Sequence, residues 1–521
     1  MLADAPPPAA EARAAGGNGT PPPLTGGALV LGTFALSLAT FMNVLDTSIA
    51  NVSIPAISGD LGVSISQGTW VITSFGVANA ISVPLSGWLT QRVGTVRLFV
   101  ASVLLFVLAS WLCGLAPSIE WLVAFRVFQG AVAGPMVPLS QTLLLASYPR
   151  HRSGTALAMW SMTTLIAPVA GPLLGGWITD NISWPWIFYI NIPVGLFAAA
   201  LTLAIYRHRE TPRRKLPVDV VGLSLLVLWV GALQIMLDKG KELDWFASGT
   251  IVVLGLVALV GLVVFLVWEL TEEHPVIDLS LFRGRNFSAG VAALALAYAL
   301  FFGNVVILPL WLQQYLGYTA TQAGMALAPV GLLAAVFTPI VGRKIGQWDA
   351  RLLATISFVV FALVLWLRSL FDTQADFVSI VIPTIVQGVA VAFFFVPLVA
   401  IVLSGLPPER IAAASGLSNF FRILAGSFGT SISTTLWDHR ASMHHAHLAE
   451  AVSRDSIGAA DAFARLQGLG LSPAQALEAI EQMAEQQAYT LSANDLFYGS
   501  AVLFVLLCGF IWITRPLPAH R

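Results

Sequence analysis

Charged residues and cysteines are both scarce in this sequence. Only 10% of the 521 residues are Asp, Glu, Lys or Arg, whereas 57% are hydrophobic. That balance excludes an ordinary soluble protein, and the net charge of −1 gives no basic surface for nucleic acid. Cys113 and Cys508 both lie in apolar runs, so they indicate neither a disulfide framework nor a metal site. A phosphate-binding Gly-x-x-x-x-Gly-Lys-Ser/Thr loop is also missing, which argues against an ATP-driven pump.

Long apolar runs recur along the whole chain and predict an all-α polytopic membrane protein with fourteen spans. Residues 1–27 are rich in Ala, Pro and Gly and predict a disordered tail. The predicted limits of the spans are 28–51, 69–90, 98–116, 119–142, 154–179, 186–206, 216–237, 250–270, 288–310, 323–342, 351–371, 377–403, 411–436 and 496–515.

Basic residues concentrate in every second connection, most clearly in 207–215. The positive-inside rule therefore places both termini in the cytoplasm. The predicted organisation is a cytoplasmic tail over 1–27, a six-helix half over 28–206, an inserted pair of helices with linkers over 207–287, a second half over 288–515 with a periplasmic loop over 437–495, and a short cytoplasmic tail over 516–521.

The two halves are related to each other. Phe128–Ala133 resembles Val386–Val391, and the two segments are 258 residues apart; Arg152 and Arg410, and Gly171 and Gly429, share this offset. A solute site between two parallel six-helix halves is a known plan for secondary transporters.

Asp46 lies inside the first apolar run, where a carboxylate is expensive unless it faces water or a partner. Arg126 lies inside the fourth span, which runs in the opposite direction. At 1.5 Å per residue, both are about 10 Å below the outer surface. We therefore predict that Asp46 and Arg126 pair, with Asp46 as the proton-coupling group. The alternative is a carboxylate that caps the end of the helix at the interface.

Two glycine-rich segments predict gating. The connection 87–97 has glycines for a tight turn and arginines that can reach acids or helix C-termini. Small residues in 167–176 permit close helix contact, and its prolines kink the helix, although ordinary packing explains them equally well. The predicted gating residues are Gly87, Arg92, Gly94, Arg97, Gly130, Gly171, Pro172, Gly175 and Gly176.

In this order, these motifs resemble the EmrB/QacA type of fourteen-helix drug:proton antiporters of the major facilitator superfamily, over residues 28–515. The resemblance implies the major facilitator fold, a place in the bacterial inner (plasma) membrane, export of hydrophobic drugs in exchange for protons, and work with a periplasmic membrane fusion protein and an outer-membrane channel. Thr90 stands where the family usually has an acid, and Ala167 where glycine is usual.

Arg422 is a third charge inside a predicted span, with no evident acidic partner in the second half. It either contributes to a cavity for aromatic or anionic solutes or bonds backbone carbonyls at a helix break. Polar and aromatic residues at similar positions extend the predicted solute cavity, whose candidates are Asn51, Asn304, Gln387, Asn419, Phe420 and Arg422.

The outer loop predicts a helix over about 473–489, because Ser472-Pro473 is a good helix start and Leu477, Ile480 and Met483 share one face. This face covers either the outer surface of the same chain or an adaptor protein. Four histidines precede the helix, but solvated side chains explain them better than a metal site.

The sequence therefore predicts a proton-coupled exporter without catalytic residues, metal or cofactor, in which drugs, protons and the lipid bilayer are the partners. A narrow exporter of one metabolite, peptide or siderophore is the alternative within transport. Outside transport, a membrane receptor or an assembly subunit that docks through the outer loop stays open.

Overall fold

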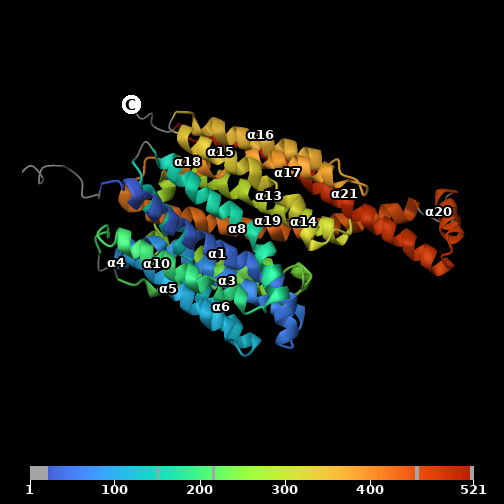
Figure 1. The fold of residues 1–521 in the computed structure, drawn as a ribbon, viewed down its shortest axis with the longest axis horizontal. Helices are drawn as coiled ribbons and strands as arrows, with labels where there is room; N and C mark the ends of the chain where they lie inside the picture. The colour runs from blue at the N-terminus through green and yellow to red at the C-terminus, as the bar shows by residue number, and fades with distance from the viewer. Residues whose placement is uncertain (1–21, 150–151, 214–216, 346, 452–456, 517–521) are drawn as a thin grey trace, which may run out of the picture.

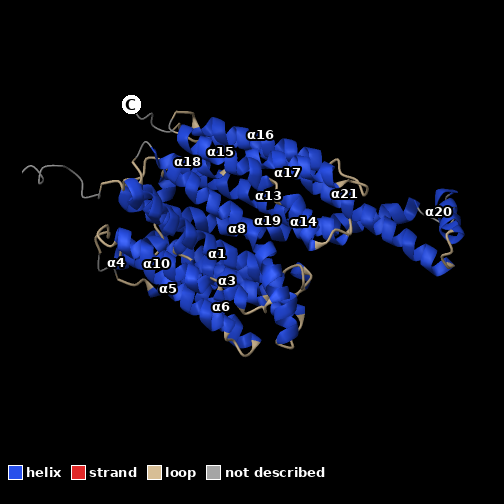
Figure 2. Cartoon of the chain, in the orientation of Figure 1, coloured by secondary structure: helices blue, strands red, loops and turns tan. Residues whose placement is uncertain are grey.

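The computed structural model describes residues 22–149, 152–213, 217–345, 347–451 and 457–516. All regular secondary structure in these ranges is helical (Figure 2). The first group of helices, called the N-terminal bundle, comprises α1 (Gly26–Asp60), α2 (Ile65–Gly68), α3 (Trp70–Ser82), α4 (Ser86–Val93), α5 (Thr95–Gly114), α6 (Ile119–Ala133), α7 (Met136–Ser147), α8 (Ser153–Asn181), α9 (Trp186–Tyr189) and α10 (Asn191–Tyr206).

Two further helices, α11 (Val220–Lys239) and α12 (Gly249–Thr271), form the inserted pair. The C-terminal bundle follows, with α13 (Arg285–Gln314), α14 (Ala320–Leu327), α15 (Val330–Lys344), α16 (Ala350–Arg368), α17 (Phe377–Ala392), α18 (Phe395–Leu403), α19 (Pro408–Ala451), α20 (Ile457–Gly468) and α21 (Pro473–Phe510). Short 3-10 segments, such as η2 (Val83–Leu85), join some of these helices.

The two bundles lie side by side, with α8 and α19 in the middle of the molecule (Figure 1). The end that holds α4 is called the inner end, and the end from which α20 projects is called the outer end. Prolines divide several predicted spans into two helices, because a proline cannot donate the backbone hydrogen bond of a helix interior. The breaks lie at Pro84 between α3 and α4, at Pro135 between α6 and α7, and at Pro329 between α14 and α15.

Twelve helical segments among the described residues are long and apolar enough to cross a membrane. The fifth and thirteenth predicted spans correspond to α8 and α19, which are not among these twelve. Helix α19 is rich in Gly, Ser and Thr, which lowers its apolar character. Helices α8 and α19 nevertheless pack against α1 and α13 respectively, as membrane helices of the two bundles do (Figure 1).

The outer part of the C-terminal bundle differs from the predicted loop. The thirteenth span continues without a break to Ala451, and the predicted helix that starts at Pro473 continues into the last span as α21. Ser472 and Gln475 form a capping box at the start of α21. The residues 437–451 contain no glycine or proline, so nothing ends α19 at the membrane surface. The result is an outer hairpin of α19, α20 and α21 that projects beyond the bundles (Figure 1).

The two bundles are in close contact at the inner end. A Cβ atom added to Gly87 of α4 would lie 2.6 Å from the Cβ of Ala413 in α19. A Cβ added to Gly154 of α8 would lie 2.2 Å from the carbonyl oxygen of Gly342 in α15. Backbone contacts this tight leave no room for a passage, so the inner end of the interface is closed at these two points.

Candidate functional site

Asp46 of α1 and Arg126 of α6 form a buried ion pair. The Nη1 atom of Arg126 donates to Oδ2 of Asp46 at 2.5 Å. The side chain of Asp46 is 1% exposed and that of Arg126 is 0% exposed. Burial of either charge alone would cost several kcal/mol, and the partner offsets much of that cost. The structure thus brings together the two residues that the depth argument paired.

Three neutral side chains complete a polar network around this pair. Asn191 donates to Oδ1 of Asp46 at 2.8 Å, and Gln129 donates to the same oxygen at 3.2 Å. Gln129 accepts from Nη1 of Arg126 at 2.6 Å and donates to Ser110 at 2.8 Å. The network therefore joins α1, α5, α6 and α10.

Arg126 is also held from the other side. Its Nε donates to the carbonyl oxygen of Val71 at 2.9 Å, and its guanidinium lies 4.3 Å from the ring centre of Phe75. The ring centre of Phe188 lies 5.5 Å from the same guanidinium. Aromatic faces attract a cation when water is absent. Arg126 therefore has a fixed position that does not depend on Asp46 alone.

Sequence reasoning did not identify Ser110, Gln129 or Asn191 as members of the site. The available signal was the same one that located Asp46, namely a polar side chain within an apolar run. Ser110 lies four residues before the end of α5, Asn191 is the first residue of α10, and Gln129 lies three residues after Arg126 in α6. A search for polar residues at equal depth would have found them.

The glycines of α8 bring this helix against α1 beside Asp46. A Cβ added to Gly171 would lie 2.4 Å from the Cβ of Ser48, and one added to Gly175 would lie 3.0 Å from the carbonyl oxygen of Ile49. Gly176 is less constrained, since its nearest neighbour would be 4.0 Å away. Pro172 lies within the same continuous helix. Gly130 of α6 makes the corresponding close approach to α3, because its Cβ would meet the carbonyl oxygen of Phe75 at 2.3 Å.

The glycine-rich connection at the inner end is held within the N-terminal bundle. Gly94 has φ of +98°, a conformation that strongly favours glycine, and it allows the turn between α4 and α5. Glu210, which follows α10, accepts from the backbone N–H groups of Val96 and Arg97 at 3.0 and 2.9 Å. Arg97 also forms an ion pair with Glu210 at 3.9 Å. The guanidinium of Arg92 lies 5.4 Å from the ring centre of Trp88.

The predicted cavity residues do not lie together in the structure. Asn419 and Arg422 lie in α19 at the interface of the bundles, and Asn419 donates to Gln141 of α7 at 3.4 Å. Arg422 donates to Asn419 at 3.0 Å and to the hydroxyl of Tyr298 at 3.2 Å, so these contacts are with side chains. The remaining candidates lie elsewhere: Phe420 packs on Trp229 of the inserted pair, Asn51 is exposed, and Asn304 and Gln387 are buried within the C-terminal bundle. Their role in solute binding stays a prediction.

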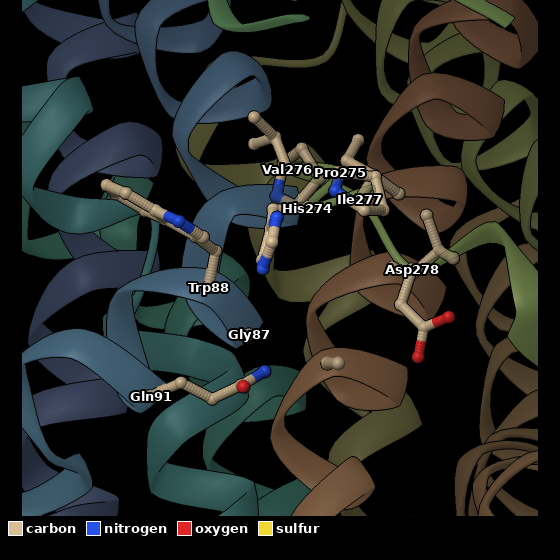
Figure 3. A pocket seen from close by; sticks show the side chains of 11 residues that line it. Gly87, Trp88, Gln91, His274, Pro275, Val276, Ile277 and Asp278 are labelled. Carbon is tan, nitrogen blue, oxygen red and sulfur yellow. The ribbon is translucent and has the colours of Figure 1, made fainter. Parts of the chain in front are cut away.

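A small cleft of about 280 Å³ lies at the inner end, where three parts of the chain meet (Figure 3). It is lined by Gly87, Trp88 and Gln91 of α4, by the connection 274–278 after α12, and by α19. Asp278 of that connection pairs with Arg410 of α19 at 2.7 Å. The cleft lies beside the Gly87–Ala413 contact, so it borders the closed part of the interface.

Comparison with known proteins gives a consistent result. Residues 36–430 match the family model of the Major Facilitator Superfamily. The chain is 53% identical to the multidrug export protein EmrB of Escherichia coli strain K12, over 95% of this chain and 97% of that protein. It is 49% identical to the fatty acid resistance protein FarB of Neisseria gonorrhoeae, over 96% of this chain and 98% of that protein.

Solved structures support the fold alone, because their sequences are distant. The human organic anion transporter MFSD10 superposes with a TM-score of 0.56 at 13% identity, over 93% of this chain and 99% of that chain. A double-tryptophan variant of XylE superposes with a TM-score of 0.57 at 16% identity, over 93% of this chain and 95% of that chain.

Proposed function

Because this chain belongs to the major facilitator superfamily, a class of transporters rather than enzymes, we propose that it exports hydrophobic drugs in exchange for protons. The close relatives named as multidrug export proteins support this substrate class. The observation that carries the coupling part of the proposal is the buried ion pair of Asp46 and Arg126. A carboxylate within the membrane and beside a fixed cation is a candidate for proton binding. A proton that binds to it removes its charge and therefore its attraction to the cation.

Asp46 is the proton carrier of this mechanism. A proton bound to Asp46 removes the charge that holds Arg126, while Gln129 still accepts from the same Nη1 atom. The arginine keeps its hydrogen bond to Val71 of α3, whereas α1 loses its electrostatic attraction to α6. Protonation thereby favours a different position of α1. A ligand or proton shifts such an equilibrium only by its differential affinity for the two states.

The path from Asp46 to the interface passes through α8. Gly171 lies on Ser48, two residues after Asp46, so a movement of α1 meets the α8 backbone directly. At its inner end, α8 makes the Gly154 contact with α15. A displacement of α8 would therefore loosen the closed inner end. In this account the two bundles move as units and expose a central solute site to one side at a time.

The orientation and assembly follow as parts of the same proposal. Both termini face the cytoplasm, which makes the inner end cytoplasmic and the outer hairpin periplasmic. The hairpin carries exposed apolar side chains at Leu469, Leu477 and Met483, which favours contact with another protein. We propose a periplasmic membrane fusion protein and an outer-membrane channel as that assembly. Under this proposal, the hairpin is the docking element and the bundles are the pump.

A narrow exporter of a single metabolite, peptide or siderophore would use the same coupling site. Substrate range separates the two: a multidrug exporter protects a pump-deleted strain against several unrelated hydrophobic toxicants, whereas a narrow exporter protects against one chemical class.

The test uses the full chain in proteoliposomes with an imposed pH gradient. Addition of a fluorescent hydrophobic drug should dissipate the gradient, and the gradient should drive drug accumulation against its concentration. Absence of both effects for every drug to which the chain gives resistance would remove proton exchange from the proposal.

A further inference from the structure

The C-terminal bundle contains a buried arginine that forms no ion pair with an acid among the described residues. Arg368 is the last residue of α16 and is 1% exposed. Its Nη2 atom donates to Thr384 at 3.0 Å and to Gln387 at 2.8 Å, and both acceptors are neutral side chains of α17. Its Nε atom is buried and makes no hydrogen bond to the described residues. Within the described part of the chain, Arg368 takes part in no ion pair and lies over no aromatic ring.

This arginine occupies the repeat-related position of the coupling site. Helix α6 begins at Ile119 and α17 begins at Phe377, which is the same 258-residue offset that relates Gln129 to Gln387. With that offset, Ser110 corresponds to Arg368, Arg126 to Thr384, and Asp46 to Asn304. Asp46 bonds Asn191 of the last helix of its bundle, and Asn304 bonds Ser500 of the last helix of its own, at 3.0 Å. The two bundles therefore carry polar side chains at corresponding positions of the repeat.

The charges of the two clusters differ in one respect. The N-terminal cluster holds one carboxylate and one guanidinium, so its net charge is zero. The C-terminal cluster also has a guanidinium, but it lies on α16, which corresponds to α5, and not on α17, which corresponds to α6. This cluster has the amide of Asn304 at the position that corresponds to Asp46. It therefore carries an uncompensated positive charge at a depth where a buried ion costs several kcal/mol.

Two other sources of compensation are weaker than an anion. The C-terminus of α16 offers partial negative charge, equivalent to roughly half an elementary charge at most. Thr384 and Gln387 offer two neutral acceptors, both to the single Nη2 atom, which leaves Nε unbonded. A buried polar group without a partner is rare in folded proteins, and an unseen ion is a recognised explanation.

We propose that Arg368, together with the side-chain amide of Gln387, holds a small inorganic anion such as chloride within the C-terminal bundle; the hydroxyl of Thr384 donates to the carbonyl oxygen of Ile380 and has no proton left for an anion. The anion neutralises the charge of Arg368, as the carboxylate of Asp46 neutralises that of Arg126 in the N-terminal bundle. This site is inferred from the unbalanced charge of Arg368 and not from the proposed export function. Evidence against one of the two would therefore not affect the other.

The test measures the thermal unfolding of the purified full chain in detergent at constant ionic strength, with sodium chloride exchanged for sodium gluconate. Chloride at ten times its dissociation constant should raise the Tm by about 1 °C in a saturable way. Arg368→Gln should abolish this dependence. Bromide should replace chloride and give an anomalous scattering peak beside Arg368 in crystals.

Gln387→Glu is the decisive companion variant, because it is nearly isosteric and places a carboxylate at the acceptor that is 2.8 Å from Arg368. It should have a Tm in gluconate at least equal to that of the wild type, with no response to chloride. Arg351→Gln, at the opposite end of the same helix, should keep the chloride response. A wild-type Tm that is equal in chloride and gluconate, or a chloride response that survives in Gln387→Glu, would overturn the anion site and indicate that water or the helix end compensates Arg368.

Discussion

Gly171 of α8 lies against Ser48 of α1, two residues from the carboxylate that pairs with Arg126. A Cβ at Gly171 would lie 2.4 Å from both Cβ and Oγ of Ser48. This relationship joins the glycine-rich segment of α8 to the ion pair, although they are more than a hundred residues apart in sequence. It also gives the glycines a physical role, because the closeness of two backbones depends on them.

Replacement of Gly171 by Ala should lower transport at least tenfold while most of the protein still inserts. The added methyl group forces α8 away from α1 and costs about 1–3 kcal/mol. The drug-driven proton flux and the Tm together measure this effect. Gly176→Ala is the matched control, because its Cβ would meet nothing closer than 4.0 Å. Equal activity of the two variants would contradict a role of the α1–α8 contact.

Asp46→Asn should abolish proton-coupled export but leave expression and folding near wild-type levels. The amide keeps the shape of the side chain and cannot exchange a proton. The measurement is drug accumulation driven by a pH gradient in proteoliposomes. Asp60→Asn, at the outer end of the same helix, is the control and should remain coupled. Uphill export by Asp46→Asn at the wild-type rate would refute the coupling role.

Arg126→Ala should reduce the membrane yield, because Asp46 is left buried without its cation. Loss of one partner of a buried pair costs about 3–5 kcal/mol. The double variant, Arg126→Ala with Asp46→Asn, should recover part of the yield and of the Tm. Additive losses in the double variant would mean that the two side chains do not interact.

Removal of residues 446–484 should spare transport in vesicles but eliminate resistance in intact cells. The deletion leaves the base of the outer hairpin intact, where Trp437 donates to the carbonyl oxygen of Tyr489 at 3.0 Å. Proteoliposome transport and the minimal inhibitory concentration of a drug are the two readouts. Loss of vesicle transport would show that the hairpin belongs to the pump mechanism itself.

A cysteine at the exposed position Glu478 should crosslink to a periplasmic adaptor in membranes that contain one. Glu481 is less suitable for this experiment, because His445 bonds its carboxylate at 2.9 Å within the hairpin. Crosslinks that reach only the outer connections of the same chain would indicate a lid and contradict adaptor docking through this face.

The sequence predicted the ion pair because depth can be counted from helix ends. Residue spacing gives position along the membrane normal, and only one acid and one arginine in the first half shared a depth. Asn191 and Ser110 escaped this argument, since neutral polar side chains are common in spans and the sequence does not show which faces meet. The contact of Gly171 with Ser48 was equally hidden, because it depends on how α8 is rotated toward α1.

For the outer helices, the sequence prediction was limited in a different way. A fall in hydropathy after residue 436 marks the edge of the hydrocarbon layer, and the sequence prediction placed the end of the thirteenth span there. A helix ends where its backbone bonds end, and α19 has no glycine or proline to end it before Ala451. Membrane boundaries and helix boundaries are therefore separate quantities.

The continuity of α19 makes the outer hairpin a rigid lever. About fourteen residues beyond Trp437 extend this helix by about 20 Å at 1.5 Å per residue. Arg440 donates to Asp495 at 2.5 Å and holds α19 against α21 near the base of the hairpin. A domain rotation of about 15° would sweep the tip of this lever by about 5 Å. A tilt of the C-terminal bundle would therefore displace the tip of the hairpin farther than its base. A protein bound to the tip would be displaced in each transport cycle.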